Sequence, residues 1–149
     1  MTENISIIGG GIAGLMLGCV AKINGRQCKI YEKSGNISTH GAGISLSPNT
    51  TKLFEKIGIL EDLIEESCTP IDVVWRKSDG EIIKKIEMKK MGQVLTTNRQ
   101  TLVKILYNRF ISLGGEIEFL YELREINGNK ITFENQESVI SGTIIGADG

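Results

Sequence analysis

A cluster of glycines near the start of the chain has the spacing of a phosphate-binding loop. The letters GGGIAG, which begin at Gly9, satisfy the pattern G-x-G-x-x-G. Gly9 would allow a tight turn, Gly11 would let a pyrophosphate approach the backbone, and Gly14 would let a helix pack closely on a strand. The helix would start at Ile12 and Ala13, and its free N–H groups and partial positive charge would face the phosphates. A glycine-rich turn without a ligand is the alternative interpretation.

A carboxylate stands where such a loop would need one. Glu32 ends the next apolar segment, 18 positions after Gly14. There it can accept hydrogen bonds from ribose hydroxyls, and its charge would repel a 2′-phosphate on that ribose. The alternative is an ordinary exposed Glu at a strand end. Loop and acid together indicate an adenine dinucleotide, and they do not separate FAD from NAD.

The loop and the acid need a parallel sheet to position them. Residues 4–8 predict a short strand, residues 12–24 a helix that ends at Asn24-Gly25, and residues 27–32 a second strand. A strand, a helix and a strand in this order form a βαβ unit, so we expect the two strands to be parallel.

The middle of the chain changes from helical to strand-like spacing. Ser47-Pro48 predicts the start of a helix that ends at Gly58. We expect its apolar face to consist of Leu53, Phe54 and Ile57. A short helix at residues 60–66 follows.

Strand-like spacing then predicts a hairpin. Residues 71–77 and 82–88 flank the turn signal Ser78-Asp79-Gly80, and a further strand is expected near residues 93–96.

The last third of the chain returns to a helix and then to strands. Residues 99–112 predict a helix whose apolar side holds Leu102, Ile105, Leu106 and Leu113. Strands are predicted at residues 116–120 and on both sides of Asn127-Gly128-Asn129, which is a second hairpin signal. The closing letters IIGADG read as a buried strand that runs into a tight turn.

Composition and charge exclude several classes of protein. The 149 residues are 40% hydrophobic with a net charge of −1, which is typical of one soluble globular domain and argues against nucleic-acid binding. Residues 5–21 carry no charge, but five glycines interrupt them and no Lys or Arg precedes them, so they suit neither a signal peptide nor a membrane span. We therefore expect a cytoplasmic protein without stable membrane association. Cys19, Cys28 and Cys68 lack metal or redox spacing, and we expect all three to be buried in a reducing compartment.

Three further stretches resemble one enzyme family when they are taken in order. They are GAGISLSPNTTKLFEKIGI at residues 41–59, NRQTLVKIL at residues 98–106, and the terminal GADG. Together with the glycine loop they resemble the flavoprotein aromatic hydroxylases, FAD-dependent monooxygenases with a p-hydroxybenzoate hydroxylase-like fold, and salicylate hydroxylase-like members most of all. The resemblance implies an α/β fold of the FAD/NAD(P)-binding, Rossmann-like (GR2) type, with inserted antiparallel strands.

The resemblance also implies roles for particular residues in binding FAD. Gly9, Gly11 and Gly14 would hold the pyrophosphate of FAD, and Glu32 the adenosine ribose. Lys33 would lie near the adenosine end, where an ordinary surface lysine is the alternative.

At the flavin end the implied contacts are Gly43 and Ile44 of the GAGI stretch. Arg99 at the start of the long helix would contact FAD, and an anionic partner would justify a cation at a helix N-terminus, although a solvated Arg is the alternative. Asp148 would help to bind FAD and the nicotinamide donor. Some relatives carry FAD-contacting arginines in the region that reads NISTH here, at residues 36–40, and this chain has none.

The activity implied is hydroxylation of a small aromatic substrate with O2 and NADH or NADPH. No residue is expected to act as a catalytic nucleophile or as a metal ligand. Residues 1–149 would be the FAD-binding domain's N-terminal portion, with part of the substrate-domain sheet at about 68–97 and the remainder of the enzyme absent. Such an incomplete fragment would expose apolar surface and favour self-association.

Other interpretations remain open at this point. The chain could be a non-catalytic, truncated FAD-binding module, or part of a related FAD-dependent reductase or epoxidase of isoprenoids. A disulfide reductase-like flavoprotein is excluded because residues 33–67 contain no cysteine. His40 and Trp75 could lie near the flavin and the substrate respectively, but a plain loop histidine and a packed tryptophan are the simpler interpretations. Tyr107 and Tyr121 are expected to be packing or surface residues.

Overall fold

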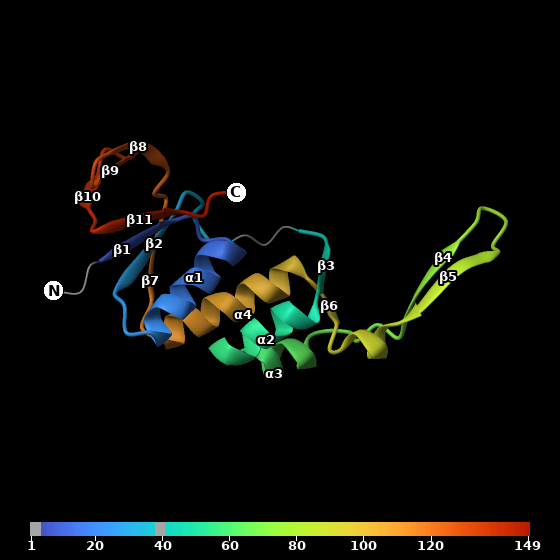
Figure 1. The fold of residues 1–149 in the computed structure, drawn as a ribbon. Coiled ribbons are helices and arrows are strands. Elements are labelled where there is room, and N and C mark those ends of the chain that lie inside the picture. The colour runs from blue at the N-terminus through green and yellow to red at the C-terminus, as the bar shows by residue number, and fades with distance from the viewer. Residues whose placement is uncertain (1–3, 38–40) are drawn as a thin grey trace. The chain divides into compact units, whose positions relative to one another are not determined.

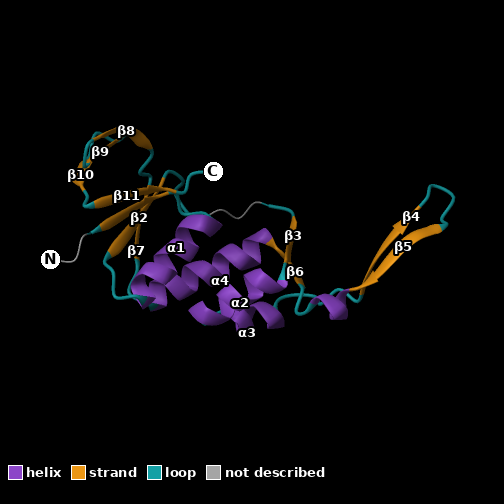
Figure 2. Ribbon diagram, in the orientation of Figure 1, coloured by secondary structure: helices purple, strands orange, loops and turns teal. Residues whose placement is uncertain are grey.

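The chain passes from one structural unit into a second and then returns. The computed structural model describes residues 4–37 and 41–149. The first unit holds the residues before Gly41 and those from Leu102 onward, and the second holds Gly41–Thr101. Helices and strands of both units are distinguished in Figure 2.

Four parallel strands form the central sheet of the first unit (Figure 1). Their order is β11 (Thr143–Gly146), β1 (Ile5–Ile8), β2 (Cys28–Glu32) and β7 (Glu116–Phe119). Helix α1 (Ile12–Ile23) joins β1 to β2, so the predicted parallel βαβ unit is confirmed. The terminal strand is β11, parallel to β1, but its residues are half-buried or exposed rather than buried as predicted.

Alternate residues of β1 and β2 face opposite sides of this sheet, as strand geometry requires. Ile7 and Ile30 are fully buried on the side of α1. Helix α4 (Arg99–Ser112) contributes Phe110 to this layer, and a Cβ atom at Gly18 of α1 would come within 2.7 Å of the Phe110 ring. The absence of a side chain at Gly18 therefore lets the two helices share one core.

The other face of the sheet is covered by a small antiparallel sheet. It consists of β8 (Leu123–Asn127), β9 (Lys130–Phe133) and β10 (Ser138–Ile140), and the predicted hairpin around Gly128 joins β8 to β9. Buried side chains from both sheets form one cluster of Ile8, Tyr31, Ile131 and Phe133. The Tyr31 and Phe133 rings stack with their centroids 4.9 Å apart.

Local capping sets the ends of helix α2 (Pro48–Ile57) in the second unit. The Ser47 hydroxyl accepts a hydrogen bond from the Thr50 amide at 3.4 Å, and Gly58 ends the helix with φ +74°. Both ends agree with the prediction, and α3 (Leu60–Glu65) follows. The predicted apolar face is wrong in one position, because Leu53 is exposed.

Two strands in the second unit pair across a long stretch of sequence. β3 (Gly43–Leu46) is antiparallel to β6 (Leu95–Asn98), with Ile44 opposite Thr97. β6 is the strand predicted near residues 93–96, shifted by two residues, whereas β3 was not expected to be a strand. The GAGI stretch is therefore partly held in a sheet.

A separate hairpin completes the second unit and projects from its helices (Figure 1). β4 (Asp72–Arg76) and β5 (Ile82–Glu87) are antiparallel, as predicted, and the short 3-10 helix η1 (Met88–Met91) follows them. The architecture as a whole is the predicted one, an α/β fold with a parallel sheet and antiparallel insertions. None of the helices in residues 4–37 and 41–149 is long and apolar enough to cross a membrane.

Candidate functional site

The carboxyl ends of three neighbouring strands meet at one edge of the parallel sheet. Gly9 follows β1, Glu32 ends β2, and Asp148 comes two residues after β11. Because the strands are parallel, all three residues lie at the same edge, which is where open α/β sheets bind ligands. The fold thus brings together residues that are far apart in the sequence.

Two glycines of the loop are required by close backbone packing. Gly9 has φ +108°, and a Cβ atom there would lie 2.5 Å from the carbonyl oxygen of Ala147. A Cβ atom at Gly14 would lie 1.9 Å from the carbonyl oxygen of Gly9. Any side chain at either position would collide with backbone, so these glycines fix the turn and let α1 begin directly against it.

Gly11 differs from both, because nothing crowds it. A Cβ atom at Gly11 would meet no atom within 4 Å, and its φ of −76° suits any residue. Neither packing within the chain nor backbone conformation therefore requires glycine here. The open space beside Gly11 is the feature expected where a ligand must approach the backbone.

The N-terminus of α1 faces this space without a side-chain cap. Gly11 is the N-cap residue and makes no side-chain capping bond, and Ile12 and Ala13 form the first turn. The first N–H groups of a helix have no partner within the helix and carry a partial positive charge. This end of α1 can accordingly bind an anion.

Glu32 is bonded to the loop itself, a contact that the sequence did not predict. Its two carboxylate oxygens accept hydrogen bonds from the backbone amides of Gly10, at 2.7 Å, and Ser34, at 2.8 Å. Burial raises the pKa of this carboxyl, but the Ser34 and Gly10 donors and the nearby charge of Lys33 outweigh burial and lower the pKa overall. Each oxygen retains a further lone pair, so ionised Glu32 can still accept hydrogen bonds from a ligand.

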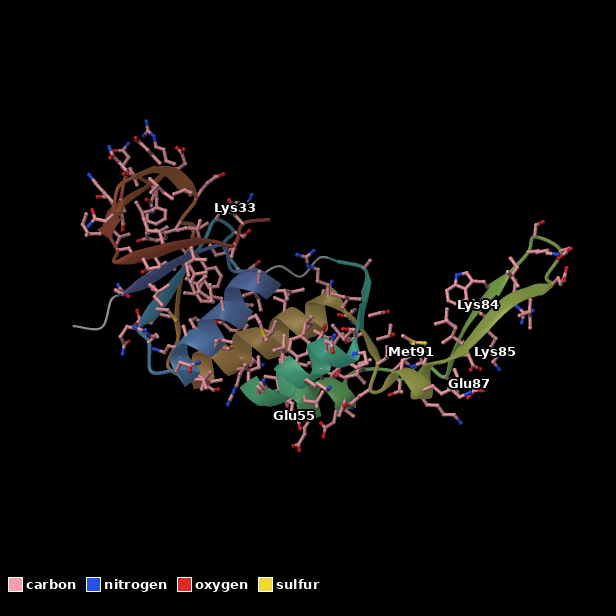
Figure 3. The ribbon with its side chains drawn as sticks, viewed as in Figure 1. Lys33, Glu55, Lys84, Lys85, Glu87 and Met91 are labelled. Carbon is pink, nitrogen blue, oxygen red and sulfur yellow. The ribbon has the colours of Figure 1, made fainter. Side chains whose placement is uncertain are left out.

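Lys33 and Asp148 flank this group as exposed side chains. Lys33 directly follows Glu32 and extends from the turn after β2 (Figure 3). The backbone amide nitrogen of Asp148 lies 3.0 Å from the position a Cβ atom would take on Gly9. The turn that begins at Asp148 is therefore packed on the glycine loop, and the Ala147 amide donates to the carbonyl of Ile8 at 2.7 Å.

The remaining predicted contacts lie in the second unit. Gly43 and Ile44 open β3, and Arg99 begins α4 beside them, with its amide donating to the carbonyl of Ala42 at 3.2 Å. Gly41 has φ +150°, and a Cβ atom there would lie 2.7 Å from the side-chain stem of Arg99. Gly41 belongs to the GAGI stretch that the resemblance places near the flavin, but its close packing against the Arg99 stem was not predicted.

Other residues considered from the sequence do not join these groups. Trp75 is about half exposed on the β4–β5 hairpin, and Tyr121 packs against Tyr31 and Phe133. Cys68 is exposed, so the expectation that all three cysteines are buried is wrong for that one. His40 lies outside the described residues. Within the described ranges, no group of three His, Cys, Asp or Glu side chains could hold a metal ion.

Comparison with known proteins identifies a family model over nearly the whole chain. The model described as FAD binding domain matches residues 2–149. The FAD-dependent monooxygenase ntnA of Nectria sp is 31% identical, over 97% of this chain and 21% of that protein. The 3-amino-4-hydroxybenzoate 2-monooxygenase PtnB3 of Streptomyces platensis is 33% identical, over 56% of this chain and 22% of that protein.

A solved structure has the same fold as this chain, at a sequence identity close to that of the two curated relatives. A 2-methyl-3-hydroxypyridine-5-carboxylic acid oxygenase superposes with a TM-score of 0.91 at 29% identity, over 100% of this chain and 40% of that one. The resemblance to FAD-dependent aromatic monooxygenases that the sequence predicts is confirmed. The chain spans about a fifth of the length of these two curated relatives and 40% of the solved structure.

Proposed function

The chain belongs to the FAD binding domain family, and on that premise we propose that its first unit holds the adenosine diphosphate half of FAD. The diphosphate lies against Gly11 and the first turn of α1, and Glu32 accepts hydrogen bonds from the adenosine ribose. Ile12 and Ala13 contribute backbone N–H groups.

The single observation that carries this proposal is the open space beside Gly11. Gly9 and Gly14 are glycines because backbone fills the space around them, whereas a Cβ atom at Gly11 would meet nothing within 4 Å. A glycine that the chain itself does not need is explained by a group that approaches its backbone from outside. The uncapped α1 N-terminus supplies the complementary charge for a diphosphate. The residues present therefore fit FAD.

The other predicted residues complete the proposed FAD contacts. Lys33 lies near the adenosine end, Arg99 contacts FAD, and Gly43 and Ile44 pass close to the flavin. Asp148 contributes to binding of FAD and of the nicotinamide donor. Bound FAD would supply the redox chemistry, while these residues bind and orient it.

We further propose that the whole protein is a monooxygenase that hydroxylates a small aromatic substrate, with O2 and with NADH or NADPH as co-substrate. Support comes from PtnB3 and the pyridine-carboxylic acid oxygenase, whose names specify aromatic ring acids. In this proposal residues 1–149 are the FAD-binding portion, and residues about 68–97 belong to the sheet that contacts substrate.

The experiment is a visible absorption spectrum of the purified chain after FAD has been added and the excess removed. Retained flavin bands are expected for the unchanged chain, and their loss is expected for Gly11→Glu, which places a carboxylate in the diphosphate space. Gly35→Glu is the matched control, because a Cβ atom at Gly35 would have one close neighbour, the Leu120 Cδ2 atom at 3.6 Å. Equal flavin retention in both variants would contradict the proposal.

A further inference from the structure

The backbone of Arg99, the first residue of α4, is fixed by contacts on both sides. β3 and β6 run side by side, and Gly43 lies opposite Asn98, the residue before Arg99 (Figure 1). The Arg99 amide donates a hydrogen bond of 3.2 Å to the Ala42 carbonyl. The Asn98 side chain caps α4, because it accepts a hydrogen bond of 2.7 Å from the Thr101 amide. The start of α4 is therefore attached to the GAGI stretch.

Gly41 lies against the aliphatic stem of the Arg99 side chain. A Cβ atom at Gly41 would be 2.7 Å from both the Cβ and the Cδ atoms of Arg99, and 3.1 Å from its Cγ atom. Atoms do not approach each other this closely, so a side chain at Gly41 is incompatible with the present path of Arg99. The φ of Gly41 is +150°, a conformation that residues with a Cβ atom rarely adopt. Both observations require glycine at this position.

This close fit lies outside the hydrophobic core, because Gly41 and Arg99 are both exposed. We propose that Gly41 is a positioning residue for Arg99. Its missing side chain makes room for the stem of Arg99 and so sets the direction in which the guanidinium group extends. The inference rests on the proposed function, in which Arg99 contacts FAD, and it explains how a long side chain is held ready for that contact.

Confinement of the stem favours ligand binding through conformational entropy. A free arginine side chain samples many rotamers, and a ligand that binds it has to restrict them. A stem confined from Cβ to Cδ has fewer rotamers to lose when its guanidinium group binds FAD. A side chain at Gly41 would displace the stem, and Arg99 would keep its charge but lose its direction. Mutation can therefore separate the position of Arg99 from its charge.

The test is the FAD affinity of the full chain, measured by flavin fluorescence in wild type, Gly41→Ala, Arg99→Gly and the double variant. Arg99→Gly removes all three atoms nearest to the new Cβ atom. We expect Gly41→Ala to bind FAD about fivefold more weakly than wild type, and Arg99→Gly about tenfold. The double variant should bind no more weakly than Arg99→Gly, because Gly41 acts through that arginine. Losses that multiply in the double variant would overturn the proposal.

Salt dependence distinguishes positioning of the arginine from a general structural effect. FAD carries its charge on the diphosphate, and added salt weakens interactions between charges. The affinity for FAD should therefore fall less steeply with salt in Gly41→Ala and in Arg99→Gly than in wild type. A salt dependence in Gly41→Ala equal to that of wild type would contradict positioning of the guanidinium group.

Gly128→Ala is the control for backbone strain without a collision. Gly128 has φ +61° in the turn between β8 and β9, and a Cβ atom there would meet nothing within 4 Å. The alanine should therefore strain the backbone but leave the affinity for FAD unchanged. A loss of affinity equal to that of Gly41→Ala would assign the effect to strain and overturn the proposal.

Circular dichroism checks the fold of each variant. If Gly41→Ala alone does not fold, the double variant should fold and bind FAD as Arg99→Gly does, because the colliding atoms are gone. A double variant that also fails to fold would overturn the proposal. So would wild-type affinity in Gly41→Ala or in Arg99→Gly, while FAD binding by the first unit would stand. A wild-type chain that binds no FAD would overturn the proposed function and this inference with it.

Discussion

The backbone amide of Gly10 donates a hydrogen bond of 2.7 Å to the Glu32 carboxylate. This bond joins the loop after β1 to the end of β2, 22 residues further along the chain. Glu32 is therefore part of the loop's own structure before any ligand is considered. The negative charge of Glu32 also lies beside the N-terminus of α1, because Gly10 directly precedes the N-cap residue Gly11.

Replacing Glu32 by Gln should loosen the loop as well as weaken FAD binding. The Gln side chain has only one acceptor oxygen, so either the hydrogen bond from Gly10 or the one from Ser34 is lost. The remaining hydrogen bond no longer has a charged acceptor. We expect the free energy of unfolding to fall by about 1 kcal/mol, after allowance for partial exposure. Chemical denaturation measures this change, and Glu55→Gln on the exposed face of α2 is the control that should have no effect.

The lowered pKa of Glu32 predicts a particular dependence of stability on pH. The folded state keeps the Glu32 carboxylate ionised below its ordinary pKa of 4.5. Its contribution to the free energy of unfolding is therefore fully present above pH 4.5. The contribution is lost as the pH falls from 4.5 through the lowered folded-state pKa. Acid denaturation of wild type and Glu32→Gln should therefore converge as the pH falls through this range. Parallel curves would contradict this origin of the pKa shift.

Gly14→Ala should destabilise the fold strongly. A Cβ atom there would lie 1.9 Å from the Gly9 carbonyl oxygen, so α1 has to move away from the loop. We expect a loss of about 1–3 kcal/mol in the free energy of unfolding. Thermal unfolding compares this variant with Gly35→Ala, where the nearest atom is 3.6 Å from the new Cβ. Similar destabilisation by both would argue against the tight packing of α1 on the loop.

The Tyr121 hydroxyl should titrate at unusually high pH. It donates to the Glu137 carboxylate, and this bond, with smaller effects of burial and neighbouring charge, raises the pKa of Tyr121 to about 12. Glu137→Gln removes the negative charge, so the pKa should fall toward its ordinary value of 10.0. Ultraviolet titration of the tyrosines measures the pKa of Tyr121 in the wild type and in Glu137→Gln. An unchanged titration curve in the variant would contradict the assignment.

Local signals made much of the fold predictable. Ser47-Pro48 and Gly58 define both ends of α2, because caps and left-handed glycines act within a few residues. β3 was missed because its partner β6 lies about 50 residues away, and four residues carry little periodicity. Leu53 was wrongly assigned to the buried face of α2, and the buried residues Val103 and Phe110 of α4 were not predicted. Tertiary packing decides which side of a helix is buried, and the spacing of apolar residues alone does not.

The site was predictable in its residues but not in its contacts. The spacing of GGGIAG and Glu32 indicated a dinucleotide loop. This spacing could not show that the Ala147 backbone occupies the space beside Gly9 while the space beside Gly11 stays open. That contrast depends on the pairing of β11 with β1, which are far apart in the sequence. The bonds from Gly10 and Ser34 to Glu32 likewise arise only when the two strand ends meet.

The most direct test of the central claim is the affinity of the chain for FAD, measured by flavin fluorescence, in wild type and Gly11→Ala. The alanine has room in the unliganded chain and an ordinary φ of −76°, so the unfolding temperature should be unchanged. FAD affinity should fall about tenfold or more, because the methyl group occupies the diphosphate's approach. ADP should compete with FAD for the wild-type chain, and FMN should not. Undiminished affinity in Gly11→Ala, or competition by FMN and not by ADP, would contradict the account.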